Sequence, residues 1–201
     1  MERPTYLLKI KERIVQSDKG SIFIPSDFFD ITDSVKVNVS LSRLEKDNTI
    51  RRVMRGVYEY PEYSEFLKEF VTPSPDKVAR ALARNYGWTI VPCGDTALNM
   101  LGLSTQVPAV WAYVSDGMYK TYAFDKIIIK FKRTANKEIT GISYKTALII
   151  QAIKVLGNGN VDDKIVQKIS KSLTGKEKSE MLTEAKYATA WIYETIKKIC
   201  N

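Results

Sequence analysis

The chain has 201 residues, 44% hydrophobic and 27% charged, a balance typical of one large or two small globular domains rather than of a disordered or fibrous protein. Lys and Arg number 31 against 23 Asp and Glu, and the resulting net charge of +8 is spread along the chain and favours a polyanionic partner. Histidine is absent, which excludes a Ser-His-Asp triad, a Cys-His dyad and any zinc site built on imidazole.

The first 60 residues predict a helix, a short strand, two further helices and a hairpin, in that order. Apolar residues at helical spacing predict the first helix: Tyr6, Leu7, Ile10 and Ile14. Residues 22–24 are too few for a helix and predict a strand, after which Ser26 or Asp27 can cap a short helix. Residues 50–60 are rich in β-forming side chains and carry Gly56 at their centre, which suits a hairpin.

The segment between this short helix and the hairpin is compatible with two structures. Val37, Leu41 and Leu44 recur as on one face of a helix, which a residue at 32–34 would cap. Val35 and Val39 also alternate with polar residues, as they would in a strand. Leu44 continues the helical period, so we predict a helix.

A proline-rich linker separates this region from the rest of the chain. Pro61 and Pro73 enclose a short amphipathic piece with Phe66, Leu67 and Phe70. Residues 74–76 (Ser-Pro-Asp) then predict the start of a helix that ends at residue 87, a glycine.

The remaining residues mix strands and helices and end in a helical portion. Strands are predicted at 88–91, 109–114, 119–124 and 126–132, with a short helix at 95–101 and a turn at 116–117. Helices are predicted at 142–156 and 162–173, and Thr174 with Glu177 offers a capping box for one final helix. That helix would carry one apolar stripe: Met181, Ala185, Ala188, Trp191, Ile192 and Ile199. We therefore predict an α+β protein with a winged helix-turn-helix at 1–60 and a mixed α+β domain at 61–201.

The third helix and the hairpin are the candidate DNA-binding surface. With Val37, Leu41 and Leu44 in the core, polar and basic side chains occupy the opposite side of the helix, where they can bond base edges or phosphates. Three arginines within five positions on the hairpin are placed as the contacts of a wing would be. The predicted DNA-binding residues are Lys36, Asn38, Ser42, Arg43, Lys46, Arg51, Arg52 and Arg55. The competing interpretation is an ordinary solvated face, on which Arg43 pairs with Asp47 one turn along.

Other motifs favour structural interpretations. The strand at 126–132 has a basic face, which predicts a solvated sheet edge rather than a second polyanion contact. The aromatic residues between 88 and 122 are expected in the core rather than on a stacking platform. The two cysteines, without a CxxC pair, predict reduced thiols, and with no signal peptide and no membrane-length apolar run we expect a cytoplasmic protein.

Nearly the whole chain resembles a known family. The most specific segment is Leu-Gly-Leu-Ser-Thr-Gln-Val-Pro at 101–108, and further matching segments lie at 41–44, 49–52, 55–58, 73–76, 79–83, 94–99, 131–132 and 187–191 and at Thr121. On these residues the chain resembles the AbiEi-type antitoxins of bacterial type IV toxin–antitoxin (abortive infection) systems, in particular the branch with a short N-terminal winged helix. It departs from that family at Thr189, where proline is common.

The resemblance implies a non-enzymatic antitoxin. Its N-terminal domain would bind double-stranded operator DNA and repress its own operon, and its C-terminal domain would counter a cognate nucleotidyltransferase-like toxin. The resemblance assigns no catalytic residue, cofactor or metal. The alternatives are a winged-helix regulator whose second domain senses a ligand and, from another class, a metal-dependent enzyme acting on nucleic acid.

Overall fold

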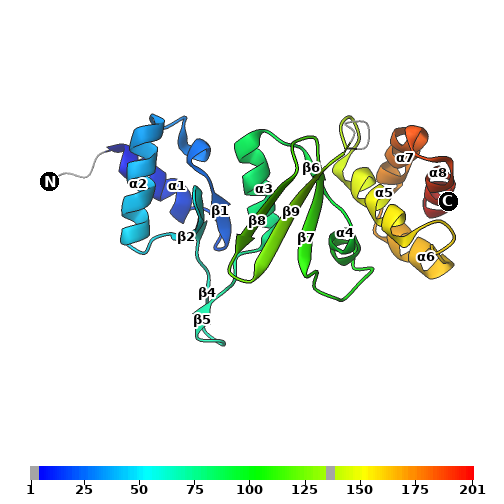
Figure 1. Cartoon of the computed structure of the whole chain (residues 1–201), viewed down its shortest axis with the longest axis horizontal. Helices are drawn as coiled ribbons and strands as arrows, with labels where there is room; N and C mark the ends of the chain where they lie inside the picture. Colours follow the sequence, from blue (N-terminus) through cyan, green and yellow to red (C-terminus); the bar gives the residue numbers. More distant parts are fainter. Residues whose placement is uncertain (1–4, 135–138) are drawn as a thin grey trace. The chain divides into compact units, whose positions relative to one another are not determined.

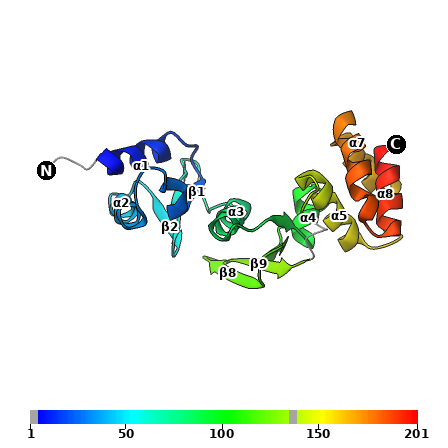
Figure 2. The ribbon, with the colours of Figure 1, turned by 90° about the horizontal axis from the view of Figure 1, so that it is seen from above.

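The computed structural model describes residues 5–134 and 139–201, which form two compact units (Figures 1 and 2). The N-terminal unit is Met1–Gly87 and the C-terminal unit is Trp88–Asn201. Both mix helices and strands, which confirms the predicted α+β class. Within the described residues, no helix is both long and apolar enough to cross a membrane.

The N-terminal unit contains the predicted elements in the predicted order. They are α1 (Thr5–Val15), β1 (Ser21–Phe23), a 3-10 helix (Pro25–Phe28), α2 (Ser34–Lys46), β2 (Arg51–Met54) and β3 (Val57–Tyr60). The three strands form an antiparallel sheet in the order β1-β3-β2. One detail differs, since the 3-10 helix is capped at Ile24, whose backbone N–H donates to the Asp27 carboxylate.

Segment 34–46 is a helix, which confirms the preferred interpretation. Asp33 is the N-cap, and its side chain accepts a hydrogen bond from the Lys36 backbone N–H. Val37 and Leu41 are fully buried, while Val35 is 71% exposed. A strand would have placed Val35, Val37 and Val39 on one face, whereas the helix buries Val37 and leaves the other two exposed.

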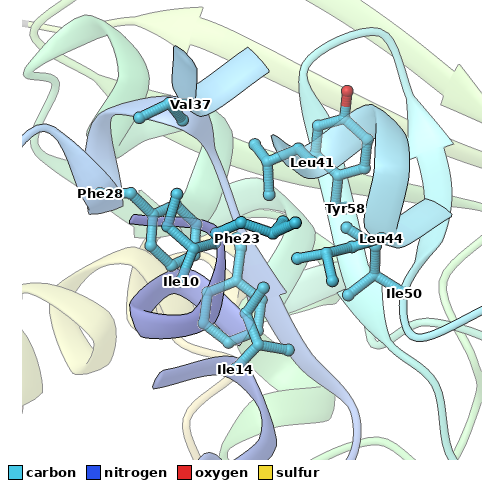
Figure 3. Packing of buried hydrophobic residues seen from close by; sticks show 10 residues of the cluster. Ile10, Ile14, Phe23, Phe28, Val37, Leu41, Leu44, Ile50 and Tyr58 are labelled. Carbon is cyan, nitrogen blue, oxygen red and sulfur yellow. The ribbon is translucent and has the colours of Figure 1, made fainter. Parts of the chain in front are cut away.

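The core of the N-terminal unit lies between α1, α2 and one face of the sheet (Figure 3). In Figure 3 the apolar side chains of α2 point toward those of α1, the 3-10 helix and the sheet. The labelled residues are Ile10, Ile14, Phe23, Phe28, Val37, Leu41, Leu44, Ile50 and Tyr58. This cluster fixes α2 by its apolar side and leaves its opposite side on the surface.

Helix α3 (Pro75–Tyr86) completes the N-terminal unit, so the predicted boundary between residues 60 and 61 is wrong. It begins at the N-cap Ser74 and ends at Gly87, whose φ is 66°, both as predicted. It packs against β1 and β3, and the Arg84 guanidinium pairs with Asp27 at 2.9 Å. The proline-rich composition of 61–75 indicated a linker between domains, but tertiary contacts hold the helix after it to the sheet before it.

The predicted amphipathic piece within this linker is a small antiparallel hairpin. Its strands are β4 (Tyr63–Ser64) and β5 (Glu69–Phe70), with Tyr63 opposite Phe70. The ring centroids of Tyr63 and Phe70 are 5.4 Å apart in an edge-to-face arrangement. Below we refer to residues 63–70 as the hairpin arm.

The C-terminal unit begins with a four-stranded sheet whose order differs from the order of the chain. The elements are β6 (Ile90–Pro92), α4 (Asp95–Met100), β7 (Val110–Ser115), β8 (Lys120–Phe124) and β9 (Ile127–Arg133). The sheet order is β6-β7-β9-β8, with β7 and β9 parallel and the other pairs antiparallel. Strand β9 therefore lies inside the sheet, and the prediction that it forms an edge is wrong.

The helical portion confirms two of the three predicted helices and corrects the third, which is divided in two. Helices α5 (Tyr144–Leu156), α6 (Asp163–Lys171) and α7 (Gly175–Glu184) follow one another, and Thr174 and Glu177 form the predicted capping box. The single final helix is interrupted after α7 by a 3-10 turn (Ala185–Tyr187), and α8 (Ala190–Cys200) follows. Ala188 has an extended backbone conformation at the break. The change of chain direction there lets apolar side chains of α7 and α8 enter one core, among them Met181, Ile192 and Ile199.

Candidate nucleic-acid interface

The surface side of α2 carries two exposed cations. Arg43 and Lys46 are exposed and make no hydrogen bond or ion pair with any residue that the structure describes. The ion pair of Arg43 with Asp47 is not formed; Asp47 is the C-cap of α2, and its backbone N–H donates to the Arg43 carbonyl. Between these cations and the helix start, Val35 and Val39 are 71% and 43% exposed. This side can therefore offer both charge and methyl groups to a ligand.

Three other predicted residues of α2 are less available. The Lys36 ammonium pairs with the Asp33 carboxylate at 2.7 Å, and this hydrogen bond raises the pKa of Lys36 and lowers that of Asp33. The Asn38 amide donates to the Ser34 carbonyl at 2.8 Å. Ser42 is half-buried. These side chains are engaged within their own helix or partly covered.

Arg51 is placed differently from the other two hairpin arginines. Its Nε and Nη2 both reach the Glu59 carboxylate, at 3.0 and 2.5 Å, and Nη2 also donates to the Val71 carbonyl. The Glu59 side chain is 2% exposed. Arg51 and Glu59 are opposite each other in the β2–β3 register, so both side chains lie on one face of the sheet. Arg51 thus pairs with a buried carboxylate, whereas the sequence predicted that it would contact a phosphate.

Arg52 and Arg55 remain on the surface. Arg52 is opposite Tyr58, whose ring belongs to the core beneath α2, so Arg52 lies on the sheet face that α2 packs against. Arg55 occupies the turn of the hairpin beside Gly56, which has a φ of 75°. Both are exposed and have no hydrogen-bond or ion-pair partner in the described part of the chain.

The end of α2 and the start of the hairpin are tied together. The backbone N–H groups of Thr49 and Ile50 both donate to the Leu44 carbonyl, at 2.9 and 3.3 Å. This turn leads from Lys46 at the end of α2 to β2 and Arg52. Of the eight predicted residues, the structure thus leaves Arg43, Lys46, Arg52 and Arg55 unpartnered and exposed on one helix and the hairpin that follows it.

A second basic surface lies on β9 in the C-terminal unit. Lys130 and Lys132 are exposed and alternate with the buried Ile129 and Phe131. The buried side includes an aromatic cluster, in which Phe131 lies 5.7 Å from Trp88 and 5.9 Å from Tyr113 between ring centroids. Tyr113 is therefore core, as predicted, and Trp88 and Tyr122 are half-buried against Phe131, but Tyr119 is 70% exposed and the prediction that it lies in the core is wrong.

The sequence did not indicate a cavity in the C-terminal unit, and it indicated the hairpin arm only as an amphipathic piece. A cavity of about 770 Å³ lies beside the break between α7 and α8, with Ile142, Ile150 and Ile192 among its apolar lining and Tyr187 at its rim. The hairpin arm is the other feature, and its apolar side chains are exposed. The cavity depends on the break between α7 and α8, and the arm depends on the turn between β4 and β5. Neither change of chain direction can be predicted from composition.

Cysteine and acidic residues form no further site in the described ranges. Both cysteines are free, as predicted, and burial raises the pKa of the Cys93 thiol. Residues 5–134 and 139–201 contain no group of three Cys, Asp or Glu side chains that could hold a metal ion.

The fold and this surface define an α+β protein whose N-terminal unit carries, on one helix and the hairpin after it, four exposed cations without a partner among the described residues. The chain belongs to a family of unknown function, DUF6088, whose model matches residues 9–182. A comparison with curated proteins found no significant match.

Proposed function

We propose that this protein is a cytoplasmic antitoxin of a type IV toxin–antitoxin system, which binds operator DNA through an N-terminal winged helix-turn-helix and represses its own operon. The observation that carries the DNA-binding part is the set of four unpartnered cations Arg43, Lys46, Arg52 and Arg55 on α2 and the hairpin after it. An α-helix fits the major groove of B-DNA, and a hairpin beside it reaches the flanking backbone.

The side chains of the surface divide naturally into two roles. Arg43 lies on the exposed side of α2, where a bidentate contact to guanine is available, and Val35 and Val39 can meet thymine methyl groups. Lys46, Arg52 and Arg55 lie toward the helix end and the hairpin, where contacts to phosphate fix the position of the helix. Specific recognition therefore depends mainly on α2, and affinity for any duplex mainly on the wing.

The antitoxin part is supported by the sequence resemblance, above all by segment 101–108. In the structure this segment follows α4 and leads into β7, and the Asn99 amide donates to the Gln106 carbonyl at 2.9 Å. A cognate nucleotidyltransferase-like toxin is the proposed second partner, and no catalytic residue is assigned to this chain.

The DNA-binding proposal is tested by Arg43→Ala in a promoter-binding assay. Loss of a base contact should cost about 1–3 kcal/mol on the specific site and little on random DNA. Lys171→Ala, on α6 in the C-terminal unit, removes the same kind of exposed charge and is the matched control. Arg43→Ala protein with normal stability and wild-type affinity for its operator would refute this placement of α2.

The antitoxin proposal is tested by co-expression with the neighbouring gene. We expect the full chain to rescue growth from that gene product, and Arg43→Ala to rescue as well while failing to repress the promoter. Absence of rescue by a stably expressed wild-type chain would contradict the antitoxin function and leave DNA binding untouched.

The cavity beside the α7–α8 break favours one second candidate, a winged-helix regulator that senses a ligand. Its volume of about 770 Å³ is in the range of small-molecule sites, and its lining combines isoleucines with Lys154, Thr183 and Tyr187. This candidate predicts that a small molecule raises the melting temperature of wild-type protein and changes operator affinity. Ala188→Trp, at a half-buried position of the lining, fills the cavity and should abolish both effects.

A further inference from the structure

We propose that the hairpin arm joins two copies of this chain. In this dimer the two arms lie side by side and antiparallel, so that Phe66 at the tip of one arm enters the cavity at the base of the other. The proposal depends on the arm and not on the DNA-binding function.

The first observation is the exposure of the arm. Phe66 is 93% exposed, Leu67 59%, Phe70 54% and Tyr63 45%, although all four belong to one eight-residue segment. In Figure 1 this segment projects away from the three-stranded sheet of its own unit. Clustered exposed apolar residues of this kind mark interaction sites rather than ordinary surface.

The second observation is that the arm is a defined hairpin. Only two residue pairs join β4 to β5, and an isolated two-stranded hairpin is marginally stable in water. At the tip, the Leu67 backbone N–H donates to the Ser64 hydroxyl, and Lys68 pairs with Glu65 at 3.3 Å. At the base, the Val71 backbone N–H donates to the Glu62 carbonyl. These contacts place Phe66 and Leu67 at the tip of the hairpin, which a partner that covers it would stabilise.

The third observation is a cavity at the base of the same arm. Its volume is about 470 Å³, and its lining includes Val15, Lys19, Tyr60, Tyr63 and Phe70. When two hairpins pair antiparallel about a twofold axis, the tip of each meets the base of the other. The same arrangement that exposes Phe66 therefore supplies a cavity with aromatic walls to receive it.

Charge selects a protein over DNA as the occupant. Glu65 and Glu69 outnumber the single Lys68 along the arm and Glu62 lies at its base, so the arm would repel phosphates. The tip carries Glu65 and Lys68, and the cavity carries Lys19 and Glu62. Each copy thus presents both signs at both ends, which suits an antiparallel contact with its own kind.

The available area is sufficient for a modest interface. With about 150–250 Å² for a fully buried aromatic side chain, the exposed parts of Tyr63, Phe66 and Phe70 supply about 300–500 Å² per copy. Both copies together then contribute about 600–1,000 Å² before any other residue is counted, close to the lower limit for a specific interface of about 1,000 Å². We therefore expect a reversible dimer rather than an obligate one.

Sedimentation velocity of the full chain across the micromolar range tests the proposal. We expect a monomer–dimer equilibrium, and Phe66→Ser should raise its dissociation constant at least about tenfold, as truncation of a central aromatic residue does. Phe29→Ser is the matched control, because Phe29 is 51% exposed in the same unit but outside the arm. A wild-type chain that stays monomeric up to several hundred micromolar, or a dimer that Phe66→Ser leaves unchanged, would overturn the proposal.

A second measurement identifies the occupant. Photoreactive benzoylphenylalanine at position 66 should crosslink between isotopically light and heavy copies of the chain, at residues that line the cavity such as Val15 and Tyr60. Crosslinks only within one copy, or to other surfaces of the second copy, would contradict the tip-to-base arrangement. Far-UV circular dichroism of each variant shows that it is folded.

Discussion

Replacing Arg51 with alanine should destabilise the N-terminal unit by about 2 kcal/mol. Arg51 gives two hydrogen bonds to the Glu59 carboxylate, whose side chain is 2% exposed. Hydrogen bonds to a charged group contribute about 1.5–3 kcal/mol, and removing one partner of a fully buried ion pair costs about 3–5 kcal/mol. The Arg51 side chain is 35% exposed, so solvent screens the pair and the lower values apply.

The neighbouring Arg52 is the matched control for this change. Arg52→Ala removes an exposed cation without a described partner and should change stability by less than about 0.5 kcal/mol. Urea unfolding followed by far-UV circular dichroism measures both variants. Tryptophan fluorescence reports the C-terminal unit separately, since Trp88, Trp111 and Trp191 all lie there. Wild-type stability of Arg51→Ala would refute the assignment of Arg51 to Glu59.

The two arginines should also differ in DNA binding. Arg52→Ala, by removing a phosphate contact, should weaken specific and random DNA alike and reduce the salt slope by about 0.9. Arg51→Ala should affect DNA binding only as far as it unfolds the N-terminal unit. Equal loss of affinity in two folded variants would show that Arg51 leaves Glu59 for the phosphate backbone.

Three further predictions concern salt, acid and the boundary between units. With Lys46, Arg52 and Arg55 on phosphates, log K against log salt should have a slope of about −3 per copy, measured by fluorescence anisotropy, and no salt dependence would contradict the proposed wing. Hydrogen bonds from the Thr174 backbone and from Lys145 lower the pKa of Glu177 to about 2, so its stabilising effect, complete above pH 4.5, should be lost as the pH falls toward 2. Glu177→Gln should therefore show a shallower loss of melting temperature across this pH window than wild type does. A fragment of residues 88–201 should fold on its own, as circular dichroism will show. In a longer fragment of residues 61–201, α3 lacks the strands β1 and β3 on which it packs, so residues 61–87 should show little protection from hydrogen exchange.

Local chemistry let the sequence predict most elements and their ends. The caps Asp33, Ser74 and Thr174 each satisfy backbone N–H groups of the same helix, and Gly87 takes the left-handed conformation that ends α3. These interactions join residues a few positions apart, so a short window of sequence contains both partners. For the same reason the apolar period at Val37 and later residues was enough to identify α2 and its exposed side.

Long-range pairing decided the points that were predicted wrongly. Strand β9 lies inside its sheet because it pairs in parallel with β7. In this register Ile128 lies opposite Val110, which is 18 residues earlier in the chain. The break between α7 and α8 follows from packing both helices into one core, although their apolar stripe also fits one straight helix. Neither choice is visible in a local period.

For the candidate site, the sequence by itself determined which residues are basic and which side of α2 is apolar. The tertiary structure decided which of the cations are available. Arg51 and Arg52 are adjacent and chemically identical, yet the pleat of β2 sends Arg51 toward the buried Glu59 and Arg52 to the opposite face of the sheet, where it stays exposed. The partner of Arg51 is set by strand register, and register is fixed only when the hairpin closes against the core, because the free energy that selects it comes from burial across the whole N-terminal unit.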